Sequence, residues 1–270
     1  MSNDATRAIA ATYSAIAPDY EQLWAPVLRP HTMRLLDLLP LAGARLVLDL
    51  GTGVGTMLGE LAGRAPRASV VGTDLSQGML ALAPRRFPRV LADAMSLPFA
   101  DASFDVVVSA FVLFNVPDPV VALAGVRGCL RPGGAFGMTT WGDAADSQEA
   151  PAYEVFTQEL DRAGAAPDPA GAIASSREAL GAEDRLDAAL ASAGFEDRAI
   201  EVTAFEHALD AEAFVRERSK LGPTRRRLDT LGPSDREACL ALATERIAAM
   251  PPADLIDRDL ILMGTGYVAS

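Results

Sequence analysis

Three glycines follow an apolar run in the segment LDLGTGVGT, residues 48–56, and could let the backbone approach a ligand closely. They occupy positions 51, 53 and 55. Glycine adopts positive φ angles without steric cost, and a helix that follows such a loop offers free N–H groups. A dinucleotide-binding fingerprint, G-x-G-x-x-G, would need its third glycine where this chain has Thr56. The spacing therefore indicates a different nucleotide loop, and Asp49 before it could orient an amine directly or through water.

Two aspartates end later apolar runs and could read a nucleoside. Asp74 in VVGTDLS can accept two hydrogen bonds from a ribose diol, and its charge would repel a 2′-phosphate, which disfavours NADP. Alternatively, Asp74 caps the helix expected to begin near Ser76. Asp93 in LADAMSLPF could accept a hydrogen bond from an exocyclic adenine amine, while the N–H of Ala94 meets a ring nitrogen. Taken alone, Asp93 would be an ordinary turn residue.

Apolar side chains near these acids could hold a planar base and a cation. Leu75, Met79 and Met95 could sandwich an adenine ring. The segment SAFVLFNVPDP supplies Phe111 and Phe114, which could border the cofactor and the substrate. Ring faces stabilise a nearby cation by about 0.5–2 kcal/mol, depending on desolvation. Each ring could equally be core packing.

An alternation of strands and helices must position these residues. Strand-like apolar runs recur at residues 46–50, 69–73, 89–92, 104–109, 135–141, 198–206 and 260–268. Helical patterns fall at residues 54–64, 76–84, 118–130, 149–163 and 182–193. Residues 1–40 look helical, with breaks expected at Pro18, Pro26 and Pro30. Repeated β-α-β units imply a parallel sheet covered on both faces, and ligands bind at the carboxyl ends of its strands. The last two strands look like a hairpin interrupted by helices.

We expect a single domain over residues 1–270. Residues 1–40 would form a helical cover, residues 41–142 a cofactor-binding core, and residues 178–209 and 250–270 the closing helix and strands. Two segments interrupt this plan and are interpreted as lid insertions, residues 143–177 and 210–249. For the first of them, a disordered linker is the alternative.

The charge balance argues against a nucleic-acid partner. The formal net charge is −12, whereas proteins that displace counterions from phosphates usually show a basic face. The one basic cluster, residues 225–227, is followed by Asp229 and Asp235 and is interpreted as a solvated helix face. Cys129 and Cys239 lack metal-ligand spacing, so we expect two buried reduced thiols and no metal.

No apolar run reaches transmembrane length, and the N-terminus MSNDATRAIA lacks a signal-peptide core. We therefore expect a soluble, cytoplasmic protein without a membrane partner. The insertion helices could also form a dimer face, so monomer and homodimer both stay open.

In chain order, these motifs resemble those of class I S-adenosylmethionine-dependent methyltransferases. The segments that carry the resemblance are LDLGTGVG, GTDLS, DAMSLPFADASFD, SAFVLFNVPDP and CLRPGG. The branch is similar to the ubiquinone/menaquinone-biosynthesis type (methyltransferase type 11) and to small-molecule methyltransferases of secondary metabolism. The match is close over about residues 46–141 and loose at YSAIAPDYE and ASAGFED. The resemblance implies a Rossmann-like, doubly wound, seven-stranded, mostly parallel sheet with an antiparallel late strand. It also implies S-adenosyl-L-methionine as cofactor and S-adenosyl-L-homocysteine as product.

The resemblance also implies which residues hold the cofactor. The glycine loop would face the methionine portion through Asp49, Gly51, Thr52, Gly53 and Gly55. The ribose would lie on Asp74, and the adenine on Leu75, Met79, Asp93 and Ala94. Beside the sulfonium would lie Ala110 and Phe111. Tyr13 and Tyr20 would close over the cofactor, unless they are ordinary packing residues.

One departure from the family concerns catalysis. Many relatives carry a histidine pair where this chain has Phe114-Asn115, and the chain has two histidines in all, His31 and His207. His207 lies late in an expected strand and is interpreted as structural or exposed. His31 follows Trp24 in the segment expected to fold over the site, so His31 is a candidate base and Asn115 a candidate catalytic residue.

Methyl transfer from a sulfonium demands little of the protein beyond aligning the acceptor in line and excluding water. A base is needed only where the acceptor loses a proton. We therefore expect a largely apolar pocket for a small hydrophobic acceptor, methylated on O, N or C, shaped by residues 143–177 and by Trp24, His31, Phe114, Asn115 and Trp141.

Three other classes of protein fit parts of the pattern. An enzyme that binds S-adenosylmethionine without methylating (a cyclase, decarboxylase or hydroxylase) shares all the cofactor motifs. An NAD(P)-linked oxidoreductase shares the sheet, although Thr56 and the Asp93 motif argue against it. A binding or scaffold protein would need neither the glycine loop nor both acids. The sequence leaves the acceptor itself open.

Overall fold

The structure is a computed structural model that describes residues 3–168 and 176–270. The chain divides into two compact units. The first comprises Met1–Ala145, Ala174–Thr203 and Leu260–Ser270, and the second comprises Asp146–Ile173 and Ala204–Asp259. The second unit contains most of the two segments expected as insertions, although residues 169–175 lie outside the described part of the chain. Its role as a lid stays a prediction.

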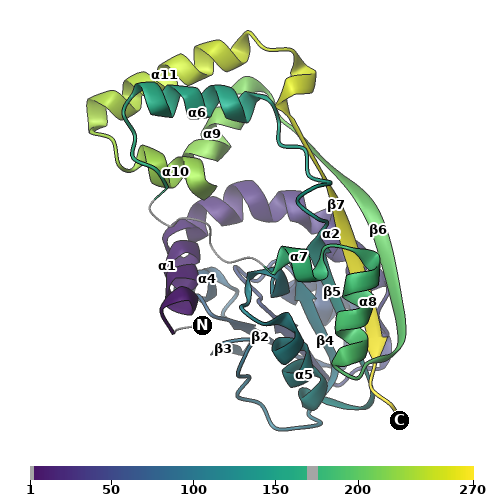
Figure 1. Cartoon of the computed structure of the whole chain (residues 1–270). Helices are drawn as coiled ribbons and strands as arrows, with labels where there is room; N and C mark the ends of the chain where they lie inside the picture. The colour runs from purple at the N-terminus through teal and green to yellow at the C-terminus, as the bar shows by residue number, and fades with distance from the viewer. Residues whose placement is uncertain (1–2, 169–175) are drawn as a thin grey trace. The chain divides into compact units, whose positions relative to one another are not determined.

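A seven-stranded sheet forms the framework of the first unit. Its strands are β1 (Leu46–Leu50), β2 (Ser69–Asp74), β3 (Arg89–Leu91), β4 (Phe104–Ala110), β5 (Leu130–Trp141), β6 (Glu196–Ala208) and β7 (Ile256–Tyr267). They run in the order β3-β2-β1-β4-β5-β7-β6 (Figure 1). Neighbours among β1 to β5 pair in parallel, and β7 pairs antiparallel with β5. The predicted α/β class, Rossmann-like and mostly parallel with an antiparallel late strand, is confirmed.

The strand order reverses between β1 and β4. From β1 the chain proceeds outward through β2 to β3, and it then returns to the other side of β1 to form β4 and β5. Connections after β1 and β4 therefore leave the sheet in opposite directions, which opens a crevice at the carboxyl ends of these strands. The glycine loop follows β1 and the segment with Phe111 follows β4, so the topology brings both to this crevice.

Apolar residues on both faces of the central strands form the core. Val47, Leu48 and Val107 are fully buried, as expected for parallel strands covered on both sides. β5 begins five residues earlier than the predicted strand at 135. Leu130 pairs with Phe104 and the next pair joins Ala135 to Val106, so residues 131–134 form a bulge within one strand.

The N-terminal segment is helical almost throughout. It forms α1 (Asn3–Asp19), a π-helical turn η1 (Tyr20–Trp24) and α2 (Ala25–Asp37). The expected break at Pro30 is wrong, because α2 continues through it. The expected break at Pro26 is also absent, because Pro26 lies in the first turn of α2, which follows η1 without a non-helical residue between them. Only Pro18, next to the end of α1, precedes a change of helix type.

Shorter helices follow the strands of the first unit. They are α3 (Leu58–Arg64), α4 (Gln77–Leu82), α5 (Pro119–Cys129), α7 (Arg177–Leu180) and α8 (Glu183–Ser192), with 3-10 turns η2 (Leu41–Gly43) and η3 (Leu113–Asn115). The Ser76 hydroxyl caps α4 by accepting from the N–H of Met79 at 3.2 Å. α1 approaches α4 so closely that a Cβ at Gly78 would lie 2.7 Å from the backbone of Ser14. This contact fixes the N-terminal helix beside the carboxyl end of β2.

The second unit has its own apolar core. Its helices are α6 (Ala152–Arg162), α9 (Ala211–Lys220), α10 (Gly222–Leu228) and α11 (Pro233–Ala248), with the 3-10 turn η4 (Pro252–Leu255) (Figure 1). Phe156 and Phe214 are fully buried among them. His207 is buried here, and its Nε2 lies 2.9 Å from Glu217 Oε2. Of the two interpretations of His207, structural or exposed, the structure therefore supports the structural one. Cys129 and Cys239 are buried free thiols in their respective units, as predicted.

The arginine cluster of α10 differs from the prediction of a solvated face. Arg226 forms a two-pronged ion pair with Asp168, with nitrogen–oxygen distances of 2.7 and 2.6 Å, and Arg227 lies 2.5 Å from Asp161. The side chains of Arg226 and Arg227 are only 17% and 14% exposed. The basic residues therefore bind aspartates of the chain itself, an outcome that sequence spacing did not reveal.

In the described part of the chain, no helix is both long and apolar enough to span a membrane. The same residues contain no cluster of three or more His, Cys, Asp or Glu side chains suited to a metal ion.

Candidate cofactor site

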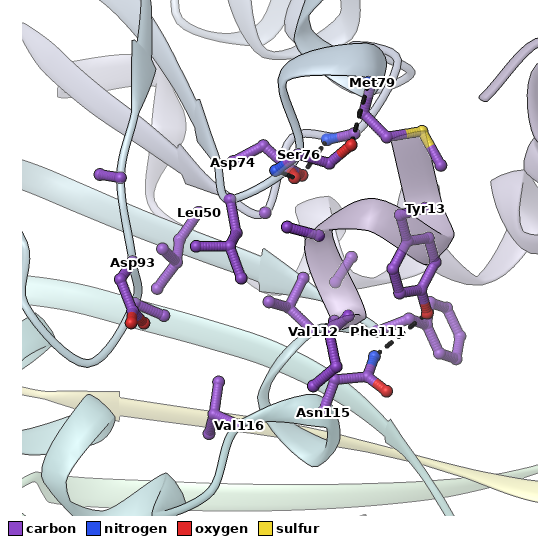
Figure 2. Close-up of a pocket in the computed structure, with 18 of the residues that line it drawn as sticks. Tyr13, Leu50, Asp74, Ser76, Met79, Asp93, Phe111, Val112, Asn115 and Val116 are labelled. Carbon is purple, nitrogen blue, oxygen red and sulfur yellow. Dashed lines mark hydrogen bonds between the residues drawn. The ribbon is translucent and has the colours of Figure 1, made fainter. Parts of the chain in front are cut away.

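A pocket at the carboxyl ends of β1, β2 and β4 brings together most of the predicted site residues. It contains about 760 Å³ of space outside the protein's atoms, within the range of small-molecule sites. In Figure 2, Asp93 lies on one side and Tyr13, Phe111 and Asn115 lie on the other, with Asp74 between them. The predicted residues that line this pocket are Tyr13, Tyr20, Gly51, Gly53, Asp74, Leu75, Met79, Asp93, Ala94, Ala110, Phe111 and Asn115.

The glycine loop depends on backbone conformations that side chains resist. Gly51, Gly53 and Gly55 have φ angles of +74°, +56° and +83°. A Cβ at Gly51 would lie 2.1 Å from Val112, whereas a Cβ at Gly53 would meet nothing within 4 Å. Gly53 also lines the pocket, so its missing side chain leaves room for a ligand against the backbone. Gly55 does not line the pocket. A Cβ at this position would lie 2.5 Å from the ring of Pro84, so the loop packs too tightly here for any larger residue.

Asp49 lies behind the loop rather than at the pocket surface. Its side chain is fully buried, and Oδ2 accepts a 2.6 Å hydrogen bond from the Thr52 hydroxyl. Oδ1 has no hydrogen-bond partner among the described residues. Burial, reinforced by the nearby charge of Asp74, raises the pKa of Asp49 to about 7, while the Thr52 hydrogen bond opposes the shift.

Asp74 connects the glycine loop to the start of α4. Its Oδ2 accepts from the N–H of Gly53 at 2.8 Å, and its Oδ1 accepts from the N–H of Ser76 at 2.7 Å. Burial raises the pKa of Asp74, and the N–H donors of Ser76, Gly53 and Leu75 oppose the shift. The cap of α4 is Ser76, so Asp74 does not cap this helix as the alternative interpretation had it; Asp74 instead holds the N–H of the cap residue. A carboxylate has about four lone-pair sites, more than these backbone N–H groups occupy, so acceptor capacity is left for a ligand.

Asp93 and its neighbours form the opposite end of the pocket. Asp93 Oδ1 accepts from the N–H of Met95 at 2.9 Å, which fixes the turn after β3. Ala92, Asp93 and Ala94 line the pocket. Met95, expected beside the adenine, instead packs against the core cluster around Leu48, because the Asp93 turn directs it away from the cavity.

Two tyrosines and an asparagine cover the other end. The rings of Tyr13 and Tyr20 meet edge to face, with centroids 6.2 Å apart. Asn115 Nδ2 donates to the Tyr13 hydroxyl at 3.3 Å, as the dashed line in Figure 2 shows. Burial raises the pKa of both tyrosines, and the negative charge of Asp74 contributes in the same direction. Both hydroxyls are therefore neutral at physiological pH and act as hydrogen-bonding groups rather than bases.

Phe111 follows β4 in a left-handed conformation with φ of +57°. Its ring is 4.9 Å from that of Trp141, which lies 6.4 Å from the ring of Trp24. Neither tryptophan lines this pocket or the second cavity described below. Phe114 also does not line it and accepts a 2.7 Å hydrogen bond from the N–H of Ser176 through its carbonyl oxygen.

His31 lies on α2 and is not among the residues of this pocket. It is partly exposed, and burial lowers the pKa of its imidazole. That shift favours the neutral form that a general base requires. His31 lines neither this pocket nor the second cavity described below, so its catalytic role stays a prediction.

A second cavity of about 400 Å³ adjoins the first. The two share Tyr20, Gly51, Gly53, Ala110 and Phe111. The second cavity extends beneath α2 and along the glycine loop, where its lining includes Leu28, Thr32, Thr52, Val54 and Met57. Thr52, which the first pocket lacks, is thus exposed to the adjoining space.

Several lining residues escaped the sequence analysis, namely Ile9, Ala10, Leu50, Ser76, Ala92, Val112 and Val116. Ile9 and Ala10 precede Tyr13 by one helical turn, so a helix periodicity anchored on Tyr13 would have found them. Ser76 and Ala92 flank the two aspartates in sequence. Nothing in residue type distinguished Val112 and Val116 from core residues.

Comparisons with known proteins place the chain in a family. A family model described as "Methyltransferase domain" matches residues 48–138. The chain is 34% identical over 203 residues to a demethylmenaquinone methyltransferase of Thermus thermophilus, a match that covers 69% of this chain and 92% of that protein. It is 42% identical over 97 residues to the ubiquinone/menaquinone biosynthesis C-methyltransferase UbiE of Desulfotalea psychrophila, covering 34% of this chain and 39% of that protein.

A solved structure shares the fold. It is the phosphoethanolamine N-methyltransferase 2 of Haemonchus contortus in complex with phosphomonomethylethanolamine and S-adenosylhomocysteine, with a TM-score of 0.54 and 19% identity. The alignment covers 89% of this chain and 53% of that one. At this identity the likeness shows the fold alone.

The chain belongs to the class I S-adenosylmethionine-dependent methyltransferases, in their ubiquinone/menaquinone-biosynthesis-like branch. It is an enzyme that uses S-adenosylmethionine to methylate a small molecule, and the comparisons do not favour the non-methylating alternative. The pocket fits this cofactor, because Gly53 leaves space against the backbone and Asp74 keeps free acceptor positions.

Proposed function

We propose that this enzyme transfers the methyl group of S-adenosylmethionine to a small, largely apolar acceptor, with the cofactor held in the pocket between Asp93 and Phe111. One observation carries the proposal: a single pocket unites a glycine loop, two strand-end aspartates and an aromatic end. These groups match the sugar, the base and the sulfonium of one nucleoside ligand.

Each group binds a different part of the cofactor. Asp74 accepts the ribose hydroxyls with the lone pairs that Gly53 and Ser76 leave free. Asp93 accepts from the adenine amine, and Met79, which is 2% exposed, forms part of the apolar wall for the ring. The backbone at Gly53 lies against the methionine portion.

The bound sulfonium supplies an activated methyl group and a neutral leaving group, so the protein's contribution is alignment and exclusion of water. Phe111 and Tyr20 line both cavities and can border the reacting end. Ile9, Val112 and Val116 add apolar wall, which lowers the local water content and favours an apolar acceptor.

Asn115 is the polar side chain best placed to orient the acceptor. Its amide nitrogen is engaged by Tyr13, which leaves Oδ1 as a hydrogen-bond acceptor. In this site an acceptor that needs deprotonation finds no base in the neutral tyrosines. The acceptor's own acidity, or His31 after a rearrangement, would have to supply that step.

The test is a turnover assay with S-adenosylmethionine and a panel of small apolar acceptors. The first acceptor is demethylmenaquinone, because one relative is named a demethylmenaquinone methyltransferase. We expect S-adenosylhomocysteine to form together with an acceptor product heavier by one methyl group. A converted substrate without methyl gain, and without S-adenosylhomocysteine, would instead support a cyclase, decarboxylase or hydroxylase.

The roles of His31 and Asn115 need a separate experiment. Single and double alanine variants are compared with wild type at saturating cofactor. A wild-type rate in the double variant would remove both residues from the mechanism.

The lid role of residues 143–177 and 210–249, and the choice between monomer and homodimer, are further proposals. Sedimentation equilibrium with and without S-adenosylhomocysteine measures the oligomeric state. Protease protection of these segments by the ligand would support a lid that closes, and unchanged cleavage would oppose it.

A further inference from the structure

Phe111 combines backbone strain with a position in the site. Three described non-glycine residues have positive φ, namely Ala102, Phe111 and Asp197, and of these only Phe111 lines either cavity. A bulky residue in the left-handed region is uncommon, and it persists where the surrounding structure imposes it. Such outliers concentrate at ligand sites, so the strain at Phe111 calls for a reason.

The neighbours of Phe111 show what holds it. Its N–H donates to Thr139 on β5, with the hydroxyl oxygen at 3.0 Å and the carbonyl oxygen at 3.1 Å. Its ring lies against Trp141, tilted by 42°, and Trp24 packs behind Trp141. The side chain is only 8% exposed. Glycine would adopt this backbone without strain, so the feature that the strained conformation preserves is the ring.

Phe111 lies at the junction of the two cavities. Phe111 lines both, together with Tyr20, Gly51, Gly53 and Ala110. This step rests on the proposed function: with adenine at Asp93 and ribose at Asp74, the sulfur lies beyond the ribose, toward this junction. In Figure 2, Phe111 is on the side of the pocket opposite Asp93.

Methyl transfer changes the charge at this point. The sulfur of S-adenosylmethionine carries a positive charge, and that of S-adenosylhomocysteine carries none. An aromatic ring attracts a cation through its quadrupole, and the attraction is stronger where water is excluded. The buried carboxyl of Asp49 and the partly buried carboxyl of Asp74 also favour a cation, but they lie at the loop and the ribose, so substituting the ring separates its contribution from theirs.

We propose that Phe111 is the residue that makes the enzyme prefer the charged cofactor to its neutral product, and that Thr139 and Trp141 hold its ring in place for that purpose. Loss of the sulfonium charge then weakens the contact with the ring, which promotes release of the product after each turnover.

The test measures the dissociation constants of S-adenosylmethionine and S-adenosylhomocysteine by calorimetry in the full chain. In Phe111→Leu and Phe111→Met, which keep apolar bulk without a ring, we expect the preference for S-adenosylmethionine to fall about three- to tenfold. Phe111→Tyr keeps the ring and should retain the preference. Phe99→Leu, at a partly buried core position outside both cavities, is the matched control and should bind as wild type does.

The outcomes separate the inference from the proposed function. An unchanged preference in whichever ring-free variant folds would overturn the role of Phe111, while leaving cofactor binding intact. Absence of binding by the wild-type protein would instead refute the proposed function, and the inference with it. Trp141→Phe should lower the preference by a smaller factor, because the ring of Phe111 loses part of its support. A Trp141→Phe protein of unchanged melting temperature and unchanged preference would remove Trp141 from the arrangement.

Discussion

The buried carboxyl of Asp49 should make the stability of the sheet unit depend on pH. Asp49 is fully buried, and burial raises its pKa to about 7. The change Asp49→Asn keeps the size of the side chain and an oxygen that can accept from the Thr52 hydroxyl, but it cannot ionise. Comparing the two proteins therefore isolates the ionisation of one group.

The sign and size of the effect follow from proton binding. The folded protein retains the proton of Asp49 up to about pH 7. An unfolded aspartate releases it near pH 4. The folded state thus binds more protons between these values, and its stability falls as the pH rises through this window. Each pKa unit corresponds to about 1.4 kcal/mol, so the wild type should lose about 2–3 kcal/mol between pH 5 and pH 8 that Asp49→Asn does not lose.

Urea unfolding followed by tryptophan fluorescence measures this difference. The two tryptophans of the chain, Trp24 and Trp141, both belong to the first unit and report on its unfolding. Asp105→Asn is the contrasting control, because the N–H groups of Arg45 and Leu46 and the Arg131 guanidinium outweigh partial burial and lower the pKa of Asp105. Its pH dependence lies below pH 4. If the wild-type and Asp49→Asn stabilities stay parallel from pH 5 to pH 8, the argument from burial is refuted.

Three further substitutions probe the pocket. Gly53→Ala should lower the free energy of unfolding by about 1–2 kcal/mol because φ at this residue is +56°. The same variant should show no detectable cofactor binding in calorimetry. The control Gly63→Ala, in α3 with open space around it, should bind the cofactor normally. Asp93→Ala should weaken S-adenosylmethionine binding about tenfold, and an unchanged dissociation constant would remove this residue from adenine recognition. Tyr13→Phe removes the hydroxyl that accepts from Asn115 and should weaken binding about threefold; tighter binding would contradict a polar role.

The sheet was predictable because the apolar runs are long and regular. The run LVLDL forms β1, in which Val47 and Leu48 are fully buried. Asp74 and Asp93, at or just after the ends of the next two strands, line the same pocket. Parallel β-α-β topology alone brings strand ends together, so Asp74 and Asp93 could be expected near each other. The glycine spacing likewise predicted positive φ angles in the loop.

The remaining features depended on tertiary contacts. Methionine is a suitable residue to contact an adenine ring, and Met95 was expected to do so. Its N–H instead donates to Asp93, and its side chain packs against the core. Trp141 was expected at the acceptor; it lines neither cavity and packs against the ring of Phe111, so its contact with an acceptor stays a prediction. The helix α2 passes through Pro30, because packing of its apolar face outweighs one missing N–H. Side-chain direction at each of these positions is set by neighbours distant in sequence.

The central claim is tested most directly by a crystal structure of the protein with S-adenosylhomocysteine. The ribose hydroxyls should lie within hydrogen-bonding distance of the Asp74 carboxylate, the adenine amine should donate to Asp93, and the sulfur should lie beside the ring of Phe111. A ligand bound elsewhere, or bound in this pocket with its ribose turned away from Asp74, would contradict the account.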